Sequence, residues 1–217
     1  MKKIFTLMIC IFAMASNKSI AQAGFSFSVK AIPQFSFLHN ESDKNNSRYD
    51  RASTFNAAFG IGAGYNFNQT IGIALDVLYS LQGQEYTLNN TEYKQKLDYI
   101  KVPVLFTYST NPANAVSFIG KIGPQISFLT NAELEDTNLD RITDDTKDRY
   151  ETATFGGAVL AGAQFRLQPK VFLTTALRFD YDFSNAEDSD YPRYPTGREK
   201  THNSTAGLEI GIKFLLK

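Results

Sequence analysis

Strict alternation of apolar and polar residues recurs in eight segments of this chain, and it constrains the fold more than any other feature. From Phe55 to Leu81, nearly every second residue is apolar, and those between them are mainly small or polar. Period two over such lengths indicates β-strands, whose side chains point alternately to opposite faces. The alternation predicts strands at residues 25–37, 55–67, 71–81, 99–108, 116–128, 153–165, 171–183 and 206–216.

The connections between these segments alternate in length. Three are short, at residues 68–70, 109–115 and 166–170, and the four others are long and polar. Long structureless loops are unusual in a compact soluble domain, whereas long loops at one end and short turns at the other are typical of outer-membrane barrels. Both termini are then expected on the periplasmic side, with the short turns.

The two faces of the predicted strands differ in charge. The more apolar register contains no charged residue. A charge facing lipid costs about 2–4 kcal/mol at the membrane midplane, so we expect this uncharged face to contact lipid. Eight strands enclose a lumen that side chains just fill. The opposite register therefore predicts a charge network inside the barrel, formed by Lys30, Asp76, Lys101, Lys121, Arg178, Asp180, Asp182, Glu209 and Lys213.

A soluble sandwich or lipocalin-like barrel is the competing interpretation, with the apolar face turned inward. Its wet face would carry more Lys and Glu than this one, which is mainly Gly, Ser, Ala, Asn, Gln and Thr. Aromatic residues of the apolar register also gather at both strand ends, as Phe25 and Tyr65 do at one end and Phe35 and Tyr79 at the other. Two aromatic girdles around an aliphatic belt are typical of transmembrane barrels.

The sequence therefore predicts an all-β fold, an eight-stranded antiparallel up-and-down transmembrane β-barrel with four long external loops and three short periplasmic turns. Pro33, Pro103 and Pro124 lie inside the predicted strands. Proline removes a donor from the strand ladder, so we expect each of the three to mark a bulge.

The N-terminus has the features of a secretory signal peptide. Lys2 and Lys3 precede an apolar run from Ile4 to Ala15, which is too short to span a membrane. We expect residues 1–22 to be the signal peptide, cleaved between Gln22 and Ala23. Residues 23–217 would then form the outer-membrane β-barrel domain, in the outer membrane of a Gram-negative cell.

Composition excludes several functions. The single cysteine, Cys10, lies in the predicted signal peptide, so the mature chain has no thiol chemistry. Removing that peptide lowers the number of basic residues from 22 to 19, against 22 acidic ones. No basic face results, so we expect no nucleic-acid partner. No catalytic motif, metal-ligand cluster or phosphate loop is present, so the sequence predicts no cofactor, no metal site and no enzyme.

The segment "LDYIKVPVLFTY", Leu97 to Tyr108, resembles the hallmark strand of the PorT-like family of small outer-membrane β-barrels. In that strand an aromatic residue, an ionisable residue and a proline precede aliphatic residues. The segment "GKIGPQISFL" from Gly120 resembles the family's next strand, and residues 155–167, 171–183 and 207–214 fit its second half. The resemblance implies a barrel without shared catalytic residues, in a family whose named member is associated with a dedicated protein-secretion system.

These observations favour a non-enzymatic, monomeric barrel that acts as a structural or interaction module through its external loops. Its expected partners are outer-membrane lipid and other envelope or secretion proteins. One alternative is a narrow porin-like channel lined by the interior charges. A second is a lipid-modifying enzyme that would use His39 and His202 with Ser36 or Ser204.

Overall fold

The computed structural model describes residues 24–40, 50–88, 91–110, 113–136, 141–192, 194 and 196–216. The predicted signal peptide and its cleavage site between Gln22 and Ala23 lie outside these residues. Within the described part, no helix is long and apolar enough to cross a membrane. The described residues lie mostly in β-strands, which are β1 (Gly24–His39), β2 (Asp50–Asn66), β3 (Ile71–Leu88), β4 (Thr91–Ser109), β5 (Val116–Asp136), β6 (Arg141–Asp145), β7 (Ala153–Gln168), β8 (Val171–Asp182) and β9 (His202–Leu215).

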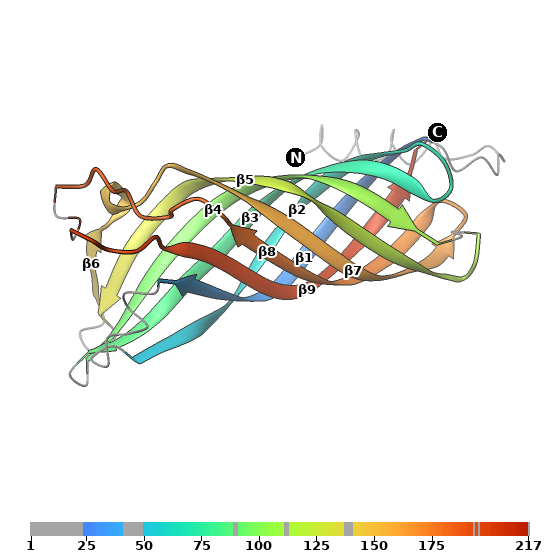
Figure 1. Ribbon diagram of the computed structural model, residues 1–217. Helices are drawn as coiled ribbons and strands as arrows, with labels where there is room; N and C mark the ends of the chain where they lie inside the picture. The colour runs from blue at the N-terminus through green and yellow to red at the C-terminus, as the bar shows by residue number, and fades with distance from the viewer. Residues whose placement is uncertain are drawn as a thin grey trace, which may run out of the picture.

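Eight of these strands form a closed antiparallel barrel. Each pairs with its neighbours along the chain, and β1 pairs with β9 to close the circle (Figure 1). The short strand β6 lies outside this circle and, among the described strands, pairs with the end of β5 alone. Closure leaves no unpaired edge, which a sheet in hydrocarbon requires. The predicted fold, an eight-stranded up-and-down barrel, is confirmed.

The strands β3 and β4 are longer than the sequence pattern predicts. Their ladder continues to the pair Leu88↔Thr91, so most of the polar segment between residues 82 and 98 is a hairpin and not a loop. The alternation fades there because both faces of this hairpin leave the membrane. Together with the end of β5 and with β6, the hairpin lengthens one end of the barrel (Figure 1).

The three prolines do not produce the bulges that we expected. Across Pro33, Pro103 and Pro124 the strand registers stay constant. Each proline instead coincides with missing pairs in one ladder, as between Ala31↔Ile210 and Gln34↔Gly207. The proline nitrogen cannot donate a hydrogen bond, and the ladder lacks a few pairs at that point. The pairs on both sides of this gap keep the two strands in the same register.

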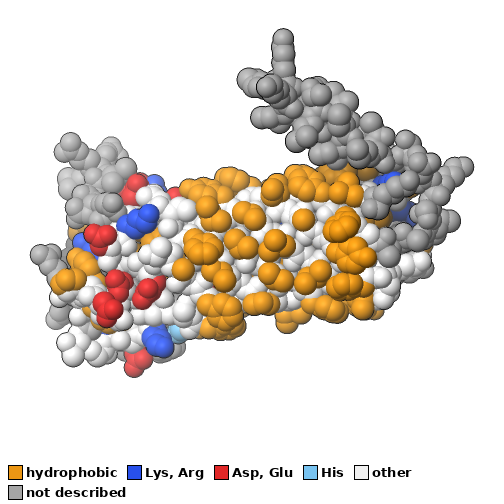
Figure 2. Space-filling model, turned by 90° about the horizontal axis from the view of Figure 1, so that it is seen from above, with side chains coloured by type: hydrophobic (Ala, Val, Ile, Leu, Met, Phe, Trp, Pro, Cys, Tyr) orange, Lys and Arg blue, Asp and Glu red, His pale blue; other side chains and the backbone are white. Residues whose placement is uncertain are grey.

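The outer surface of the barrel is formed by the uncharged register of the strands, as the sequence predicts. Its exposed large side chains are apolar and form a broad band around the barrel, while charged side chains gather beyond one end of that band (Figure 2). Aromatic rings contact one another at both ends, as Phe25 and Tyr65 do at one end and Phe35 and Phe55 at the other, with ring centroids 5.0 and 5.2 Å apart. The apolar face thus points outward on every barrel strand, which excludes the lipocalin-like interpretation.

A charge placed on this band should weaken the barrel according to its depth. Leu177, at the middle of β8, is 72% exposed. We expect Leu177→Arg to lower the free energy of unfolding in lipid vesicles by about 2–4 kcal/mol. The matched variant Leu167→Arg, near the periplasmic end of β7, should cost about 0–1 kcal/mol. Equal losses in denaturant titrations of the two variants would contradict the assignment of this band to lipid.

Candidate functional site

All nine charged residues of the predicted network lie on the lumen side of the barrel wall. Seven of them are buried, and Lys121 and Lys213 are half-buried. They come from β1, β3, β4, β5, β8 and β9, so strands far apart in sequence contribute to one interior cluster. The structure joins seven of the nine through ion pairs, and it leaves Asp182 and Lys213 outside that chain.

Glu209 on β9 is the centre of the ion-pair chain. Its Oε1 lies 3.0 Å from Lys121 Nζ and 3.5 Å from Lys30 Nζ, and its Oε2 lies 3.1 Å from Arg178 Nη1. Lys30 also donates a hydrogen bond to Asp76 Oδ2 at 2.7 Å. One carboxylate therefore holds three cations from three other strands, and a second carboxylate shares Lys30.

The chain of ion pairs continues across the lumen through Arg178. Its Nε donates to Asp180 Oδ1 at 2.9 Å, and its Nη2 donates to Gln125 at 3.3 Å. Asp180 also accepts from Lys101 Nζ at 3.1 Å, which links β8 to β4. These charged side chains are only 2–3% exposed, so no water-filled path passes them. Their pairing compensates for the cost of burying charge.

A layer of amide and hydroxyl side chains lies on the extracellular side of the charges. Gln34 donates to Ser80 Oγ at 2.9 Å, and Gln82 donates to the same oxygen at 2.9 Å. Asn203 in turn donates to Gln82. Sequence reasoning missed this layer, although its members occupy inward positions of the predicted strands or of their extensions.

An apolar lid closes the lumen above this layer. It consists of five buried residues, Leu38, Leu97, Tyr99, Leu129 and Ala132, with Tyr150 packed against them. Tyr150 follows a single 3-10 turn, η1 (Lys147–Arg149), outside the membrane-spanning strands. Burial raises the pKa of its phenol well above the ordinary value, because the charged form would lose its hydration. Tyr150 therefore stays uncharged where its ring packs against the lid.

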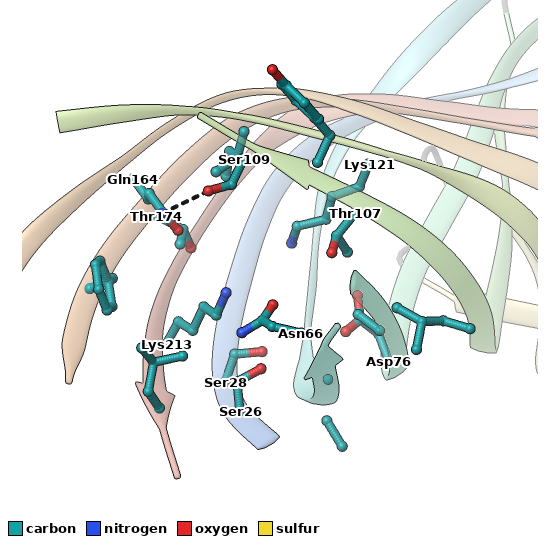
Figure 3. Close-up of a pocket in the computed structure, with 18 of the residues that line it drawn as sticks. Ser26, Ser28, Asn66, Asp76, Thr107, Ser109, Lys121, Gln164, Thr174 and Lys213 are labelled. Carbon is teal, nitrogen blue, oxygen red and sulfur yellow. Dashed lines mark hydrogen bonds between the residues drawn. The ribbon is translucent and has the colours of Figure 1, made fainter. Parts of the chain in front are cut away.

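At the opposite end the lumen opens into a vestibule of about 70 Å³ that faces the periplasm. Lysine, serine and threonine side chains from several strands point into it (Figure 3). Lys30, Lys121 and Asp76 belong to the ion-pair chain at its inner end. Lys213 enters from β9, and it makes no ion pair within the described part of the chain.

The two histidines of the enzyme alternative do meet, but on the outer face. His39 and His202 are register partners of β1 and β9, and both point away from the lumen. Ser36 points inward, where its hydroxyl donates to Gly83 O at 2.8 Å, so it cannot reach either imidazole. Ser204 shares the outer face with His202 but forms no hydrogen bond with it. His202 Nδ1 contacts Asp182 O at 3.0 Å, and its ring stacks on Tyr181.

Hydrogen bonds join the extracellular segments into a rim above the lid. Asn40, just after β1, donates to Glu199 O and to Thr201 Oγ1, each at 2.7 Å. Arg198 binds Glu187 through two nitrogens, at 2.5 and 2.8 Å. Segments that follow β1 and β8 thereby support one another. We call this described extracellular part the rim. It comprises residue 40 and residues 82–98, 129–152 and 183–201, with the gaps given above and without the residues of the lid and of the amide layer.

Metal-binding geometry is not present in the described residues, where no three His, Cys, Asp or Glu side chains are grouped to hold an ion.

Comparisons with known proteins agree with this architecture. A family model described as "Outer membrane protein beta-barrel domain" matches residues 14–188. The fold is similar to that of a major outer membrane protein from Thermus thermophilus, with a TM-score of 0.52 and 14% identity over 88% of this chain and 99% of that one. It is also similar to Neisserial surface protein A, with a TM-score of 0.51 and 15% identity over 89% and 98%. None of the curated proteins compared matches the chain in sequence.

Removing the central carboxylate should destabilise the barrel strongly. In Glu209→Gln two buried cations and the half-buried Lys121 lose part of their compensation, and we expect the free energy of unfolding to fall by about 3–5 kcal/mol. The control is Glu85→Gln, which removes a half-exposed pair with Lys94 at 3.4 Å and should cost under about 1 kcal/mol. Denaturant titration of both folded variants measures the difference, and similar losses would show that Glu209 is not central.

Proposed function

Because the chain belongs to the outer membrane protein β-barrel domain family and is an outer-membrane protein, we propose that it is a non-enzymatic anchor whose rim binds another envelope protein. The observation that carries this proposal is the closed lumen. Three successive layers fill it, the ion pairs around Glu209, the amide layer around Gln82 and the apolar lid around Tyr99. With the interior occupied by its own side chains, the rim is the large surface left for a partner.

The rim has the pre-ordered backbone that a binding surface benefits from. Glu151 N donates to Ala186 O at 2.9 Å, Ala186 N donates to Thr201 O at 2.8 Å, and Asp188 N donates to Arg149 O at 2.9 Å. These bonds hold described parts of two external connections together. Binding residues concentrate on loops that a rigid scaffold positions, and preordering lowers the entropic cost of association.

The charges of the rim favour a protein partner. Lys147, Asp148 and Arg149 follow one another in η1, and Lys94 on the β3–β4 hairpin pairs with Glu85. Charges of both signs are thus interspersed on the described rim, whereas a polyanionic surface polymer would call for a basic patch. Mixed charges suit a partner with a complementary pattern, which gives specificity and orientation.

The finer proposal is that the chain is PorT-like and that its partner belongs to a protein-secretion or envelope-assembly system. The segment Leu97 to Tyr108 supports it, because its distinguishing residues share one environment. Tyr99 belongs to the lid, Lys101 to the ion-pair chain and Pro103 to the lumen wall. Because residues of this segment help to fill the lumen, the segment is consistent with a barrel that binds its partner through the rim. Each barrel strand is paired on both sides, so the proposal needs no second copy of the chain.

The closed lumen also gives an expectation for the channel alternative. Side chains at the ion-pair layer have almost no accessible surface, so ions have no hydrated path. We expect the folded protein to produce no unitary current steps in planar bilayers, measured beside an open porin that shows that insertion is detected. Reproducible steps whose size changes in Lys101→Ala would contradict the closed lumen and favour the channel.

Photo-crosslinking in native membranes tests the proposed function. A photoreactive phenylalanine analogue is placed at Asp148, Asp190 or Lys200, which are exposed on the rim. We expect a protein adduct at one or more of these positions, whose identity also tests the link to secretion. The control position is Leu177, which faces lipid and should give no protein adduct. Absence of protein adducts at all three rim positions would overturn the proposal.

A further inference from the structure

The periplasmic vestibule contains more positive than negative charge. Three lysines line it, Lys30, Lys121 and Lys213, together with one carboxylate, Asp76. Glu209, just above them, is already shared among Lys30, Lys121 and Arg178. Over the whole interior, five basic residues face four acidic ones. The lumen therefore carries one more cation than its own carboxylates can balance.

The excess charge can be assigned to Lys213. Every other lysine or arginine of the network has a carboxylate oxygen within 3.5 Å, whereas Lys213 has no ion pair within the described chain. Its ammonium points into the vestibule from β9, and that of Lys121 points in from β5 (Figure 3). Two ammonium groups therefore line one cavity.

Neutral hydrogen-bond donors complete the wall. Ser26 and Ser28 of β1, Asn66 at the end of β2 and Thr107 of β4 all line the vestibule (Figure 3). None of these four side chains donates a hydrogen bond to another described residue, so their donors remain available to a ligand. A cavity of about 70 Å³ has room for a few water molecules or one small anion. Its open end faces the periplasm, which gives a ligand an entry path.

We propose that this vestibule is a binding site for a phosphate group, with Lys213 and Lys121 as the charged donors and serine and threonine hydroxyls as neutral ones. Charge-assisted hydrogen bonds from ammonium groups are about twice as strong as neutral ones. The bound anion would balance the one uncompensated interior charge. Free phosphate and the phosphate of a lipid headgroup share this chemistry.

Binding is measured on the folded barrel in a neutral detergent, at constant ionic strength, with inorganic phosphate as the probe. Phosphorus NMR should show saturable broadening of the phosphate resonance by the wild-type protein. Lys213→Gln shortens the side chain only slightly and removes its charge, and we expect it to weaken phosphate binding about tenfold or more. Because Lys213 has no ion pair within the described chain, its replacement should leave the gel mobility of the barrel unchanged and should not lower its unfolding midpoint.

The control is Arg166→Gln, which removes one positive charge from the exposed periplasmic end of β7 but not from the vestibule. It should bind phosphate as the wild type does. No saturable broadening by the wild-type protein, or equal weakening in both variants, would overturn the proposal. Displacement of phosphate by short-chain phosphatidylglycerol would identify a lipid headgroup as the source, and its failure to displace would identify free phosphate.

Discussion

Hydrocarbon offers no hydrogen bonds to a polypeptide backbone, and the rest of this structure depends on that constraint. Each strand must satisfy its ladder on both sides, so the sheet closes through the pairing of β1 with β9. Closure then separates the side chains into an outer set without charge and an inner set that must be satisfied by its own members. The ion-pair chain around Glu209 is a consequence of this separation, because any charge carried by a spanning strand has to point inward.

The interior is layered because different depths of the lumen have different access to water. The periplasmic vestibule is open, and there Lys213 is left without an ion pair to any described residue. Farther in, Lys101, Arg178 and Asp180 are almost fully buried and are paired with one another. At the extracellular end apolar side chains replace charges, and Tyr150 closes the lid from outside the spanning strands. Ion pairing therefore increases from the vestibule to the middle of the lumen, whereas buried Asp182 is held by a hydrogen bond from Thr154 instead of an ion pair.

The sequence was sufficient for the strands and their faces, because one physical cause, contact with lipid, acts on every second residue. The sequence did not predict the parts of the structure that lie outside the membrane or depend on contacts between distant strands. The hairpin from Gln82 to Asp98 has water on its outer side, so its alternation is weak and the sequence pattern predicts a loop there. Leu97 continues the inward register of the predicted strand and could have indicated the lid, but Tyr150 reaches the lid from a distant segment. The ion partners depend on the relative heights of tilted strands, which no local pattern encodes.

The glycines of β2 show how residues without charge shape the network. Lys30 on β1 lies opposite Gly60 of β2, and Asp76 on β3 lies opposite Gly62. The two charged side chains meet across β2, at 2.7 Å. A Cβ atom on Gly62 would lie 2.1 Å from Asp76 Oδ1, too close for the carboxylate to stay where it binds Lys30. The small residues on this face are therefore not a wet surface. Because they lack bulky side chains, they leave room for Lys30 of β1 and Asp76 of β3 to form an ion pair across β2.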